Sequence, residues 1–300
     1  MKYVVTGGAG FVGSYLVKLL IKKGHEVTVI DNLHKGKKEN LKSVLPKIKF
    51  EEIDIRDYEN MEKKLKNIDG VFHQAALTVV QDSFDRPEEY HDVNVVGTEN
   101  IFKLAKENSF KVVYASSSSV YGHQDKMPIE ETAERKPINP YGKTKLDDEY
   151  LFEKYSKLGT KIIGLRYFNI FGKGQTLEYA GVITKFLDRI NQKQPPIIFG
   201  QGTQIRDFVF VEDIVMANLL AMESQVTNSL VNVGTGKAIT ILELANMMID
   251  SSNQNLKPIF KNSLDGDIEK SQANISLAIN SFNWNPKKEL QEWLKEIFSE

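Results

Sequence analysis

The sequence predicts an α/β protein built on a doubly wound parallel sheet, and three observations support this prediction. Short apolar or β-branched runs alternate with helical stretches along the first half of the chain. A glycine-rich turn joins the first strand to the first helix, and small or polar residues follow several later strands. Such alternation is typical of a parallel sheet covered on both faces. Ligands bind these sheets beyond the carboxyl ends of the strands, where the small and polar residues gather.

The first strand and the first helix flank the glycine-rich run at residues 6–13. Residues 2–5 resemble a strand, residues 14–23 follow a helical pattern, and Gly24 ends the helix. Glycine allows a sharp turn and a close approach to a pyrophosphate, whose charge then meets the free N–H groups at the helix start. The spacing is G-x-x-G-x-x-G and not the commoner G-x-G-x-x-G. It predicts a dinucleotide site formed by Gly7, Gly10, Phe11, Val12 and Gly13.

The second strand, residues 25–30, ends at Asp31. A carboxylate roughly 20 residues after the glycines accepts hydrogen bonds from the adenosine ribose. It also repels a 2′-phosphate, so we expect Asp31 and the adjacent Asn32 to contact NAD and not NADP. Alternatively, the two residues only open a turn. The basic loop that follows either accepts a 2′-phosphate or forms a solvated surface; it carries His34, Lys35, Lys37 and Lys38.

Four further strands are expected, and the residues that follow them suit a ligand site. Residues 50–53 lead to an acidic residue where an adenine edge could be read. Residues 70–73 lead to small residues, which let the backbone pass close to a cofactor. Residues 111–115 and 161–166 are the other two strands. The cofactor contacts expected after the first two are Asp54, Ile55, Ala75 and Ala76.

Residues 140–150 carry a catalytic signal. Pro140 suits the first turn of a helix, and Tyr141 and Lys145 are spaced so that they project from one helix face. A cation beside a phenol stabilises the phenolate, which can take a proton from a sugar or alcohol hydroxyl while hydride leaves the carbon. Alternatively, this is an ordinary helix face that carries a tyrosine and a lysine.

A serine run at residues 116–119 follows an apolar strand and precedes Val120-Tyr121-Gly122. A hydroxyl at that strand end can hydrogen-bond the reacting oxygen and share its proton with Tyr141. Serine clusters also form simple polar loops. Four serines at the end of a strand favour a catalytic hydroxyl.

In this order, the glycine turn, Asp31, the serine run, Tyr141 and Lys145 resemble the extended short-chain dehydrogenase/reductase superfamily. Within it, the chain is similar to the NAD-dependent nucleotide-sugar epimerases of the UDP-glucose/UDP-N-acetylglucosamine 4-epimerase type. The resemblance extends from the first residue to about Pro286. It implies a Rossmann-type fold, tightly held NAD and a transient 4-keto sugar. It also implies that Ser117 is the catalytic serine beside Tyr141 and Lys145.

The resemblance implies further contacts. Asn94 matches an asparagine near the cofactor, and Tyr167 matches a residue beside the nicotinamide in the segment R-Y-F-N. Asn169 ends that segment and contacts the substrate diphosphate in the family. Residues 202–208 match the motif G-x-x-x-R-D-[FY], whose arginine, here Arg206, binds the nucleotide diphosphate. A guanidinium fork suits a diphosphate.

One segment departs from the family. An arginine that grips the diphosphate is replaced by Leu264, within residues 263–267. Either substrate affinity is weaker or another cation supplies the charge. By the same alignment, Ser271 lies where a bulky residue can exclude N-acetyl groups, so its small side chain leaves room for N-acetylhexosamines. The alternative cations are Lys257, Lys261 and Lys270.

The expected reaction type depends on an acidic residue that this chain lacks. Dehydratases and decarboxylating relatives carry an acidic residue just before V-Y-G, whereas this chain has Ser118 and Ser119 there. The resemblance therefore favours 4-epimerisation, in which one tyrosine serves both directions. The alternatives are a 4,6-dehydratase, a reductase or an alcohol dehydrogenase of the same superfamily, and a non-enzymatic NAD-sensing or scaffold protein.

We expect an NAD-binding Rossmann domain over residues 1–170 and mainly a smaller substrate domain over residues 171–300. Residues 232–236 look like a strand that returns to the sheet, so the two lobes are expected to interleave. Residues 239–250 follow an amphipathic helical pattern. Thr240 and Glu243 have the spacing of a capping box at its start.

Composition limits the partners. The 300 residues carry a net charge of −1, which gives no reason to expect nucleic acid or an anionic membrane as a partner. The chain has no cysteine, and its five histidines lack the spacing of metal ligands, so no metal is expected. No apolar run approaches about 18 residues, so we expect a cytoplasmic enzyme. Leu146, Leu151 and Tyr155 form either a helical homodimer interface or part of the core.

Overall fold

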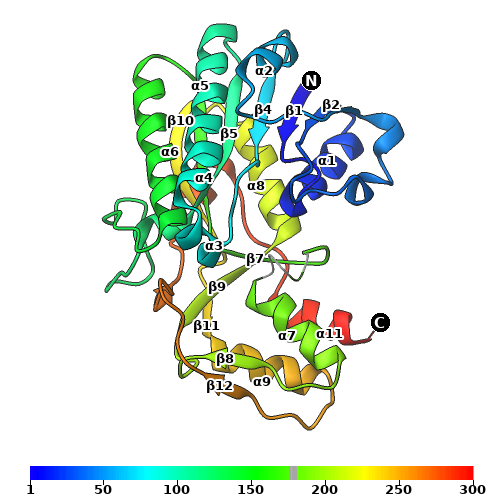
Figure 1. Ribbon diagram of the computed structural model, residues 1–300, viewed down its shortest axis with the longest axis vertical. Coiled ribbons are helices and arrows are strands. Elements are labelled where there is room, and N and C mark those ends of the chain that lie inside the picture. Colours follow the sequence, from blue (N-terminus) through cyan, green and yellow to red (C-terminus); the bar gives the residue numbers. More distant parts are fainter. Residues whose placement is uncertain (176, 178–180, 300) are drawn as a thin grey trace.

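The computed structural model describes residues 1–175, 177 and 181–299. The larger lobe contains seven strands: β1 (Lys2–Thr6), β2 (Glu26–Ile30), β3 (Lys49–Glu51), β4 (Gly70–His73), β5 (Lys111–Ser117), β6 (Ile162–Tyr167) and β10 (Asn228–Val233). They form one sheet in the order β10-β6-β5-β4-β1-β2-β3 (Figure 1), and every neighbouring pair is parallel. The predicted Rossmann-type α/β fold is confirmed.

Helices cover both faces of this sheet. Successive residues of a strand face opposite sides, so Val4 packs in one core and Val5 in the other. The Val5 core is covered by α1 (Phe11–Lys22), α8 (Val211–Glu223) and α10 (Ser276–Phe282). The Val4 core is covered by α2 (Tyr58–Lys64), α5 (Gly97–Asn108) and α6 (Pro140–Lys157). Figure 1 shows α5 and α6 side by side.

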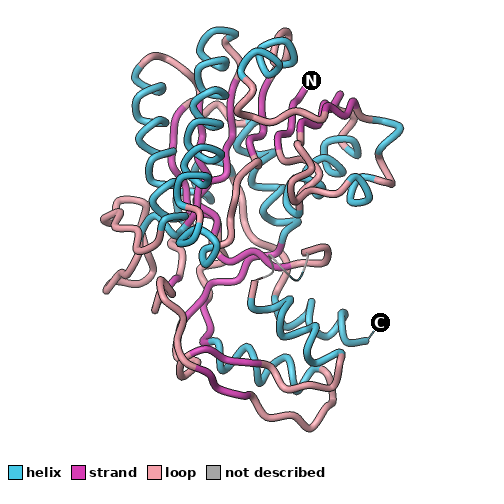
Figure 2. The backbone as a smooth tube through the Cα atoms, in the orientation of Figure 1, coloured by secondary structure: helices cyan, strands magenta, loops and turns pink. Residues whose placement is uncertain are grey.

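Short helical segments connect these layers. The 3₁₀ turns η1 (Lys38–Leu41) and η2 (Leu45–Lys47) lie between β2 and β3, and η4 (Ser118–Tyr121) follows β5. α3 (Val80–Asp85), α4 (Pro87–His91) and the π-helical turn η3 (Asp92–Val96) lead from β4 to α5. Residues 122–139, between η4 and α6, are mostly loop (Figure 2).

The smaller lobe has its own sheets and core. β7 (Asn169–Phe171), β9 (Ile205–Phe210), β11 (Ala238–Thr240) and β13 (Lys270–Ser271) form a four-stranded sheet. β8 (Ile197–Phe199) pairs with β12 (Ile259–Lys261). The helices that pack in this lobe are α7 (Val182–Asn191), α9 (Ile241–Ser251) and α11 (Leu290–Ser299).

The chain crosses between the two lobes more than once. After β6 it enters the smaller lobe through β7, α7, β8 and β9, and then α8 and β10 return to the larger lobe. β10 pairs in parallel with β6 along the edge of the sheet. It is the return strand expected from residues 232–236, although it begins at Asn228 and ends at Val233. The division at residue 170 stays a prediction.

Helix α9 begins with the predicted capping box. Thr240 Oγ1 accepts a hydrogen bond from the N–H of Glu243 (3.1 Å), and the Glu243 carboxylate accepts one from the N–H of Thr240 (2.7 Å). The helix starts at Ile241 and not at residue 239, because Ile239 pairs with Arg206 in the sheet.

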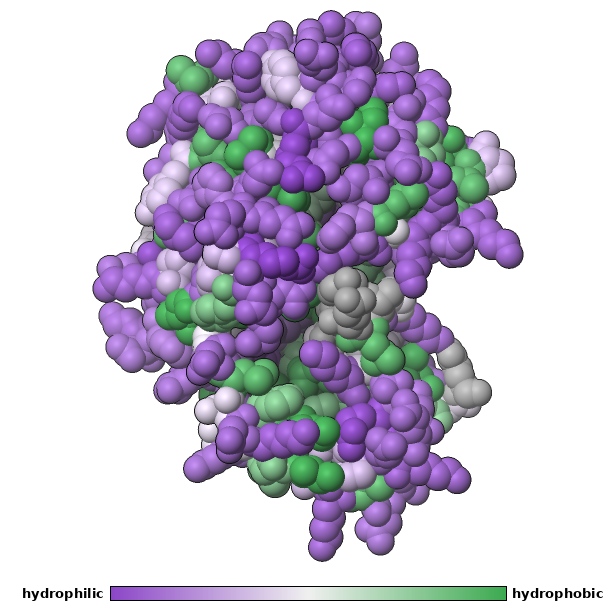
Figure 3. Space-filling view, viewed as in Figure 1, coloured by the Kyte–Doolittle hydropathy of each residue, from purple (hydrophilic) through white to green (hydrophobic). Residues whose placement is uncertain are grey.

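The surface in Figure 3 is mainly hydrophilic and is indented between the two lobes. Within the described part of the chain, no helix is both long and apolar enough to cross a membrane. Leu146 and Tyr155 are buried, and Leu151 packs against the same core as Tyr155. Of the two roles expected for these three residues, the structure therefore supports core packing.

Candidate active site

The glycine turn between β1 and α1 has no room for side chains. Gly7 has φ +64°, in the left-handed region, and a Cβ there would lie 2.7 Å from the backbone of Ala75. A Cβ on Gly13 would lie 2.1 Å from the carbonyl oxygen of Gly7. The N–H of Gly10 donates to that same oxygen (3.0 Å). The turn leaves the start of α1 open to an anion, so these residues fit the pyrophosphate of a dinucleotide.

Asp31 lies just after β2 and lines the cleft that begins at the glycine turn. Its carboxylate accepts hydrogen bonds from the N–H groups of Ala9 (2.9 Å) and Leu33 (2.8 Å). Burial raises the pKa of Asp31, and the two N–H groups oppose this shift. Asp31 therefore opens a turn and also lines the cleft, so the two alternatives coexist. In the basic loop, Lys38 pairs with Glu52 at the surface.

The outer end of this cleft contains the predicted Asn32, Asp54 and Ile55. The Arg56 guanidinium donates two hydrogen bonds to Asp54 (both 2.9 Å), and the side-chain amide of Asn32 donates another (2.9 Å). These bonds lower the pKa of Asp54 to about 2. Arg56 was not predicted, and its only signal in the sequence is its place shortly after Asp54. It adds a cation to this end of the cleft.

The inner part of the cleft is lined by Ala76, which follows β4, and by Tyr167 at the end of β6; Ala75 lines the outer part. The Tyr167 hydroxyl donates to Gln74 Oε1 (3.2 Å) and accepts from Nδ2 of Asn218 (2.7 Å). Burial raises the pKa of Tyr167, so this phenol stays neutral. Gln74 and Asn218 were not predicted from the sequence, because they lie on segments far from Tyr167.

The three predicted catalytic residues share one cleft. Ser117 ends β5, and its Oγ accepts the N–H of Ser119 (3.1 Å). Tyr141 lies in the first turn of α6, one turn before Lys145, whose side chain is 4% exposed. The structure brings these residues together with the glycine turn: the same cleft is lined by Gly7, Gly10, Phe11, Val12, Gly13, Ser117, Tyr141 and Lys145.

Asn94 lies behind the cleft and is fully buried. Its amide exchanges two hydrogen bonds with the backbone of Leu77 (2.8 and 3.0 Å) and donates to Thr144 Oγ1 (3.0 Å). The Thr144 hydroxyl in turn donates to the carbonyl oxygen of Tyr141 (2.8 Å). Asn94 therefore braces the first turn of α6, and the structure does not bring it to the cleft wall.

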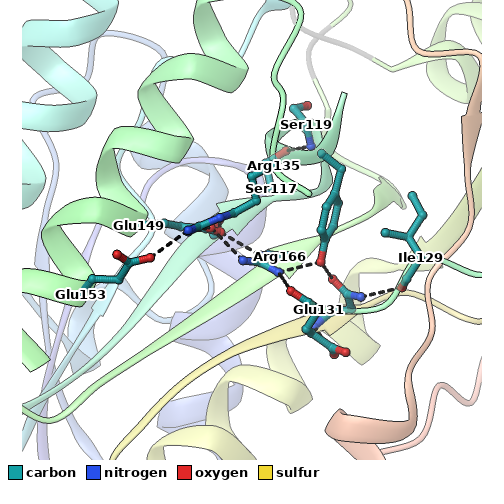
Figure 4. A network of polar contacts seen from close by, with 11 residues as sticks. Ser117, Ser119, Ile129, Glu131, Arg135, Glu149, Glu153 and Arg166 are labelled. Atoms are coloured by element: carbon teal, nitrogen blue, oxygen red, sulfur yellow. Dashed lines mark hydrogen bonds and ion pairs between the residues drawn. The ribbon is translucent and has the colours of Figure 1, made fainter. Parts of the chain in front are cut away.

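A buried ionic network lies behind the serine run (Figure 4). Arg166 of β6 makes two hydrogen bonds to Glu149 of α6 (2.7 and 2.8 Å). Arg135 of the 122–139 loop also donates to Glu149 (3.0 Å), and Ser116 Oγ donates to it (2.7 Å). Ser116 is thus engaged in holding Glu149. Its neighbour Ser117 lines the cleft, and its Oγ accepts the backbone N–H of Ser119 instead of contacting Glu149.

A second cleft lies in the smaller lobe and is lined by the predicted Asn169 and Arg206. Arg206 pairs with Asp267, which was not predicted. Leu264, at the position where the resemblance implies an arginine, lines the same cleft. The other cations along this wall come from α7, and they are Lys185 and Arg189.

Several predicted positions do not reach this cleft. Among the described lining residues, none is Lys257, Lys261 or Lys270, so the extra charge comes from α7. Ser271 is 4% exposed and pairs in register with Arg206 through β13, and it is not among the described residues that line either cleft. Within residues 1–175, 177 and 181–299, no group of three or more His, Asp or Glu side chains could hold a metal ion.

Comparison with known proteins agrees with this geometry. The family model described as the NAD dependent epimerase/dehydratase family matches residues 3–234. A UDP-glucose 4-epimerase of Lactobacillus helveticus is 34% identical over 310 residues, which cover 96% of this chain and 93% of the relative. A UDP-N-acetyl-alpha-D-glucosaminuronate decarboxylase of Bacillus cytotoxicus is 35% identical over 249 residues, which cover 81% of this chain and 77% of the relative.

The fold is also similar to a solved structure over its whole length. The crystal structure of the UDP-glucose 4-epimerase of Thermotoga maritima with UDP-glucose matches with a TM-score of 0.94 and 36% identity. The match covers 100% of this chain and 98% of that chain.

Proposed function

Because this chain belongs to the NAD dependent epimerase/dehydratase family, we propose that it is a nucleotide-sugar 4-epimerase that works with bound NAD. The observation that carries the proposal is that Ser117, Tyr141 and Lys145 share one cleft with the glycine turn. The proposed substrate is a UDP-hexose or a UDP-N-acetylhexosamine. This class is supported by the similar proteins, which include UDP-glucose 4-epimerases, one of them solved with UDP-glucose.

The residues that would hold NAD follow the cleft from end to end. The glycine turn holds the pyrophosphate, and Asp31 and Asn32 hold the adenosine ribose. Asp54 and Ile55 lie at the adenine end, and Tyr167 lies at the nicotinamide end, beside Tyr141 and Lys145. When bound, NAD accepts hydride from C4 of the sugar and returns it.

Tyr141 is the proposed base. As the phenolate it takes the proton of the C4 hydroxyl, while Ser117 hydrogen-bonds the same oxygen. The positive charge of Lys145 stabilises the phenolate. Tyr141 later returns the proton to the C4 oxygen, so one residue serves both directions. Asn169 and Arg206 keep the diphosphate anchored while the 4-keto sugar turns, and this turn inverts C4.

The alternative is another reaction on the same fold, such as a 4,6-dehydratase, a reductase or an alcohol dehydrogenase; a decarboxylase is among the similar proteins. The resemblance links elimination and decarboxylation to an acidic residue just before V-Y-G. Among the described residues that line the cleft around Tyr141, none carries a carboxylate. This observation favours epimerisation.

We also propose a homodimer. The adjacent helices α5 and α6 lie on the outside of the larger lobe, and Tyr150 of α6 is 48% exposed. Burying this aromatic ring against a second copy would support association. Sedimentation velocity of the wild type and of Tyr150→Glu measures the oligomeric state of each protein. A cytoplasmic location is likewise a proposal, which cell fractionation tests.

The function is tested by incubating the purified protein with UDP-N-acetylglucosamine and, separately, with UDP-glucose, and following C4 by proton NMR. We expect the galacto epimer to form without added cofactor, because NAD is held tightly. The Tyr141→Phe variant should bind NAD and lose about 10²- to 10⁴-fold in turnover.

Two results would count against this proposal. The first is the absence of any epimer even with NAD added, which would remove UDP-hexoses as substrates. The second is near wild-type turnover by Tyr141→Phe with NAD bound, which would remove the tyrosine as base. A steady release of NADH during the reaction would instead support a net oxidoreductase.

A further inference from the structure

Lys145 is held by a carboxylate that the mechanism above does not use. Its Nζ donates to Oδ2 of Asp148, three residues later on α6, at 3.1 Å. The two side chains are 4% and 0% exposed. Charges this deeply buried are screened little by solvent and salt. The charge of Asp148 therefore also affects any charged group that lies next to the Lys145 ammonium.

The groups around Asp148 come from three elements. Helix α6 contributes Lys145 and Glu149, and β5 contributes the neutral phenol of Tyr114. Helix α5 contributes Thr98, whose hydroxyl lowers the pKa of Asp148. Glu149 is itself paired with two arginines. Lys145 is thus the cation in direct contact with Asp148 in the described part of the chain.

A line of hydrogen bonds runs from Thr98 toward the cofactor cleft. Thr98 Oγ1 lies 2.9 Å from Nε2 of His73, and Nδ1 of His73 lies 2.7 Å from Thr6 Oγ1. The N–H of Ala75 donates to Thr6 Oγ1 (3.4 Å). Ala75 also borders the cleft. The line therefore joins the wall of the proposed NAD site to Thr98, which lowers the pKa of Asp148.

His73 lies at the centre of this line. A neutral imidazole ring donates one hydrogen bond and accepts another, so it can bridge the hydroxyls of Thr6 and Thr98. Burial and the nearby Lys145 lower the pKa of His73 to about 3, so the ring is neutral, as the line requires.

We propose that Asp148 is a positioning residue that fixes the Lys145 ammonium and offsets part of its charge, and thereby sets the pH range in which Tyr141 is a phenolate. The inference rests on the proposed function, since it concerns the base of that reaction. An anion behind the ammonium weakens the attraction between the ammonium and a phenolate in front of it. Removing the anion should let the enzyme work at lower pH.

The charge on Asp148 is present under ordinary conditions. Burial raises the pKa of Asp148 to about 6, against the opposing effect of Lys145. Its Oδ1 has no hydrogen-bond partner among the described residues, so this oxygen is available for a proton in acid. Above about pH 6 the carboxylate is ionised, and its effect on Lys145 is fully present. Below that pH the wild type resembles a variant without the charge.

The test is the pH profile of kcat for epimerisation, measured between about pH 5 and pH 9 for the wild type, Asp148→Asn and Asp147→Asn. Asp147 is the matched control, because it is the adjacent carboxylate and pairs with Lys143 (2.6 Å) at the surface. We expect the acidic limb of Asp148→Asn to move to lower pH by about one unit, a tenfold higher kcat on that limb. Asp147→Asn should follow the wild type.

If Asp148→Asn does not fold, Thr98→Val decides, since it keeps the carboxylate and removes a hydroxyl that lowers the pKa of Asp148. Asp148 should then stay protonated to higher pH, and the acidic limb should move in the same direction by a smaller amount. Acidic limbs that coincide with the wild type in the folded variants would overturn the inference.

A readout that needs no turnover separates this inference from the proposed function. Carbon-13 NMR of Asp148 in the wild type should show an ionised carboxylate above about pH 6. A carboxyl group that is protonated at neutral pH would overturn the inference, because it has no charge to offset that of Lys145. A wild-type protein with the expected ionisation and no epimerase activity would count against the proposed function instead.

Discussion

His73 is a buried histidine whose environment opposes its protonation. Its pKa is about 3 in the folded protein, well below the ordinary histidine value of 6.5, which applies to the unfolded chain. Between these values the unfolded chain binds a proton and the folded protein does not. The contribution of His73 to stability is therefore complete above about pH 6.5 and is lost as the pH falls toward 3.

We expect this loss to appear in a comparison with His73→Gln. The free energy of unfolding of the wild type, relative to the variant, should fall by up to about 1.4 kcal/mol per pH unit below pH 6.5. Urea unfolding of both proteins at a series of pH values measures the difference, which should be constant above pH 6.5. A difference that does not change with pH below 6.5 would show that His73 titrates normally.

Leu264 lines the substrate cleft with Arg206 and stands where the family has an arginine. We expect Leu264→Arg to lower the KM for a UDP sugar by about tenfold, because a hydrogen bond to a charged group contributes about 1.5–3 kcal/mol. The value of kcat should stay the same, since the diphosphate is held equally before and during the reaction. Initial rates over a range of substrate concentrations measure both. An unchanged KM would mean that Lys185 and Arg189 already supply the charge.

The site residues that the sequence predicted lie within short motifs. Gly7, Asp31, Ser117 and Tyr141 each follow or begin an element whose pattern is visible locally. Arg56, Asp148 and Asp267 were missed because their roles depend on partners brought together by the fold. For the same reason, the sequence could not predict that Asn94 lies behind the cleft or that Ser271 pairs with Arg206 through β13.

At the level of elements, the turn between β1 and α1 depends on the absence of one Cβ. We expect Gly13→Ala to weaken NAD binding more than tenfold, because the new Cβ would lie 2.1 Å from the Gly7 oxygen and push the turn open. Gly181→Ala is the control, since its Cβ would have no neighbour closer than 4.0 Å among the described residues. Fluorescence titration with NADH measures the affinity. Equal affinity in both variants would contradict this account of the turn.

The strands of the larger sheet were predicted to within a few residues, since they are apolar runs bounded by turn residues. β4 matches its prediction at both ends, whereas β5 includes the first two serines of the run. β7, β8 and β11–β13 were not predicted. Each has only two or three residues, too few for an alternating pattern, so the partner strand defines them.

On the scale of the whole molecule, the proposed NAD cleft and the Arg206 cleft share no lining residue in the described part of the chain. We expect NAD at 100 times its Kd to add about 2.7 kcal/mol to the free energy of unfolding and to raise the Tm. UDP should add a separate stabilisation through the Arg206 cleft. Differential scanning calorimetry of the wild type and Gly13→Ala measures both effects. In the variant the NAD effect should shrink and the UDP effect should remain; loss of both would show that the clefts are not independent.

The path of β10 has a consequence for synthesis of the protein on the ribosome. A nascent chain that ends after β6 exposes that strand along one edge, because its partner β10 has not yet been made. The unpaired N–H and C=O groups of such an edge are a template for aggregation. The ribosome must therefore deliver β7, α7, β8 and β9 of the smaller lobe before the larger sheet is complete. A gene cut after residue 170 is expected to yield insoluble protein, so the two lobes cannot be made as independent halves.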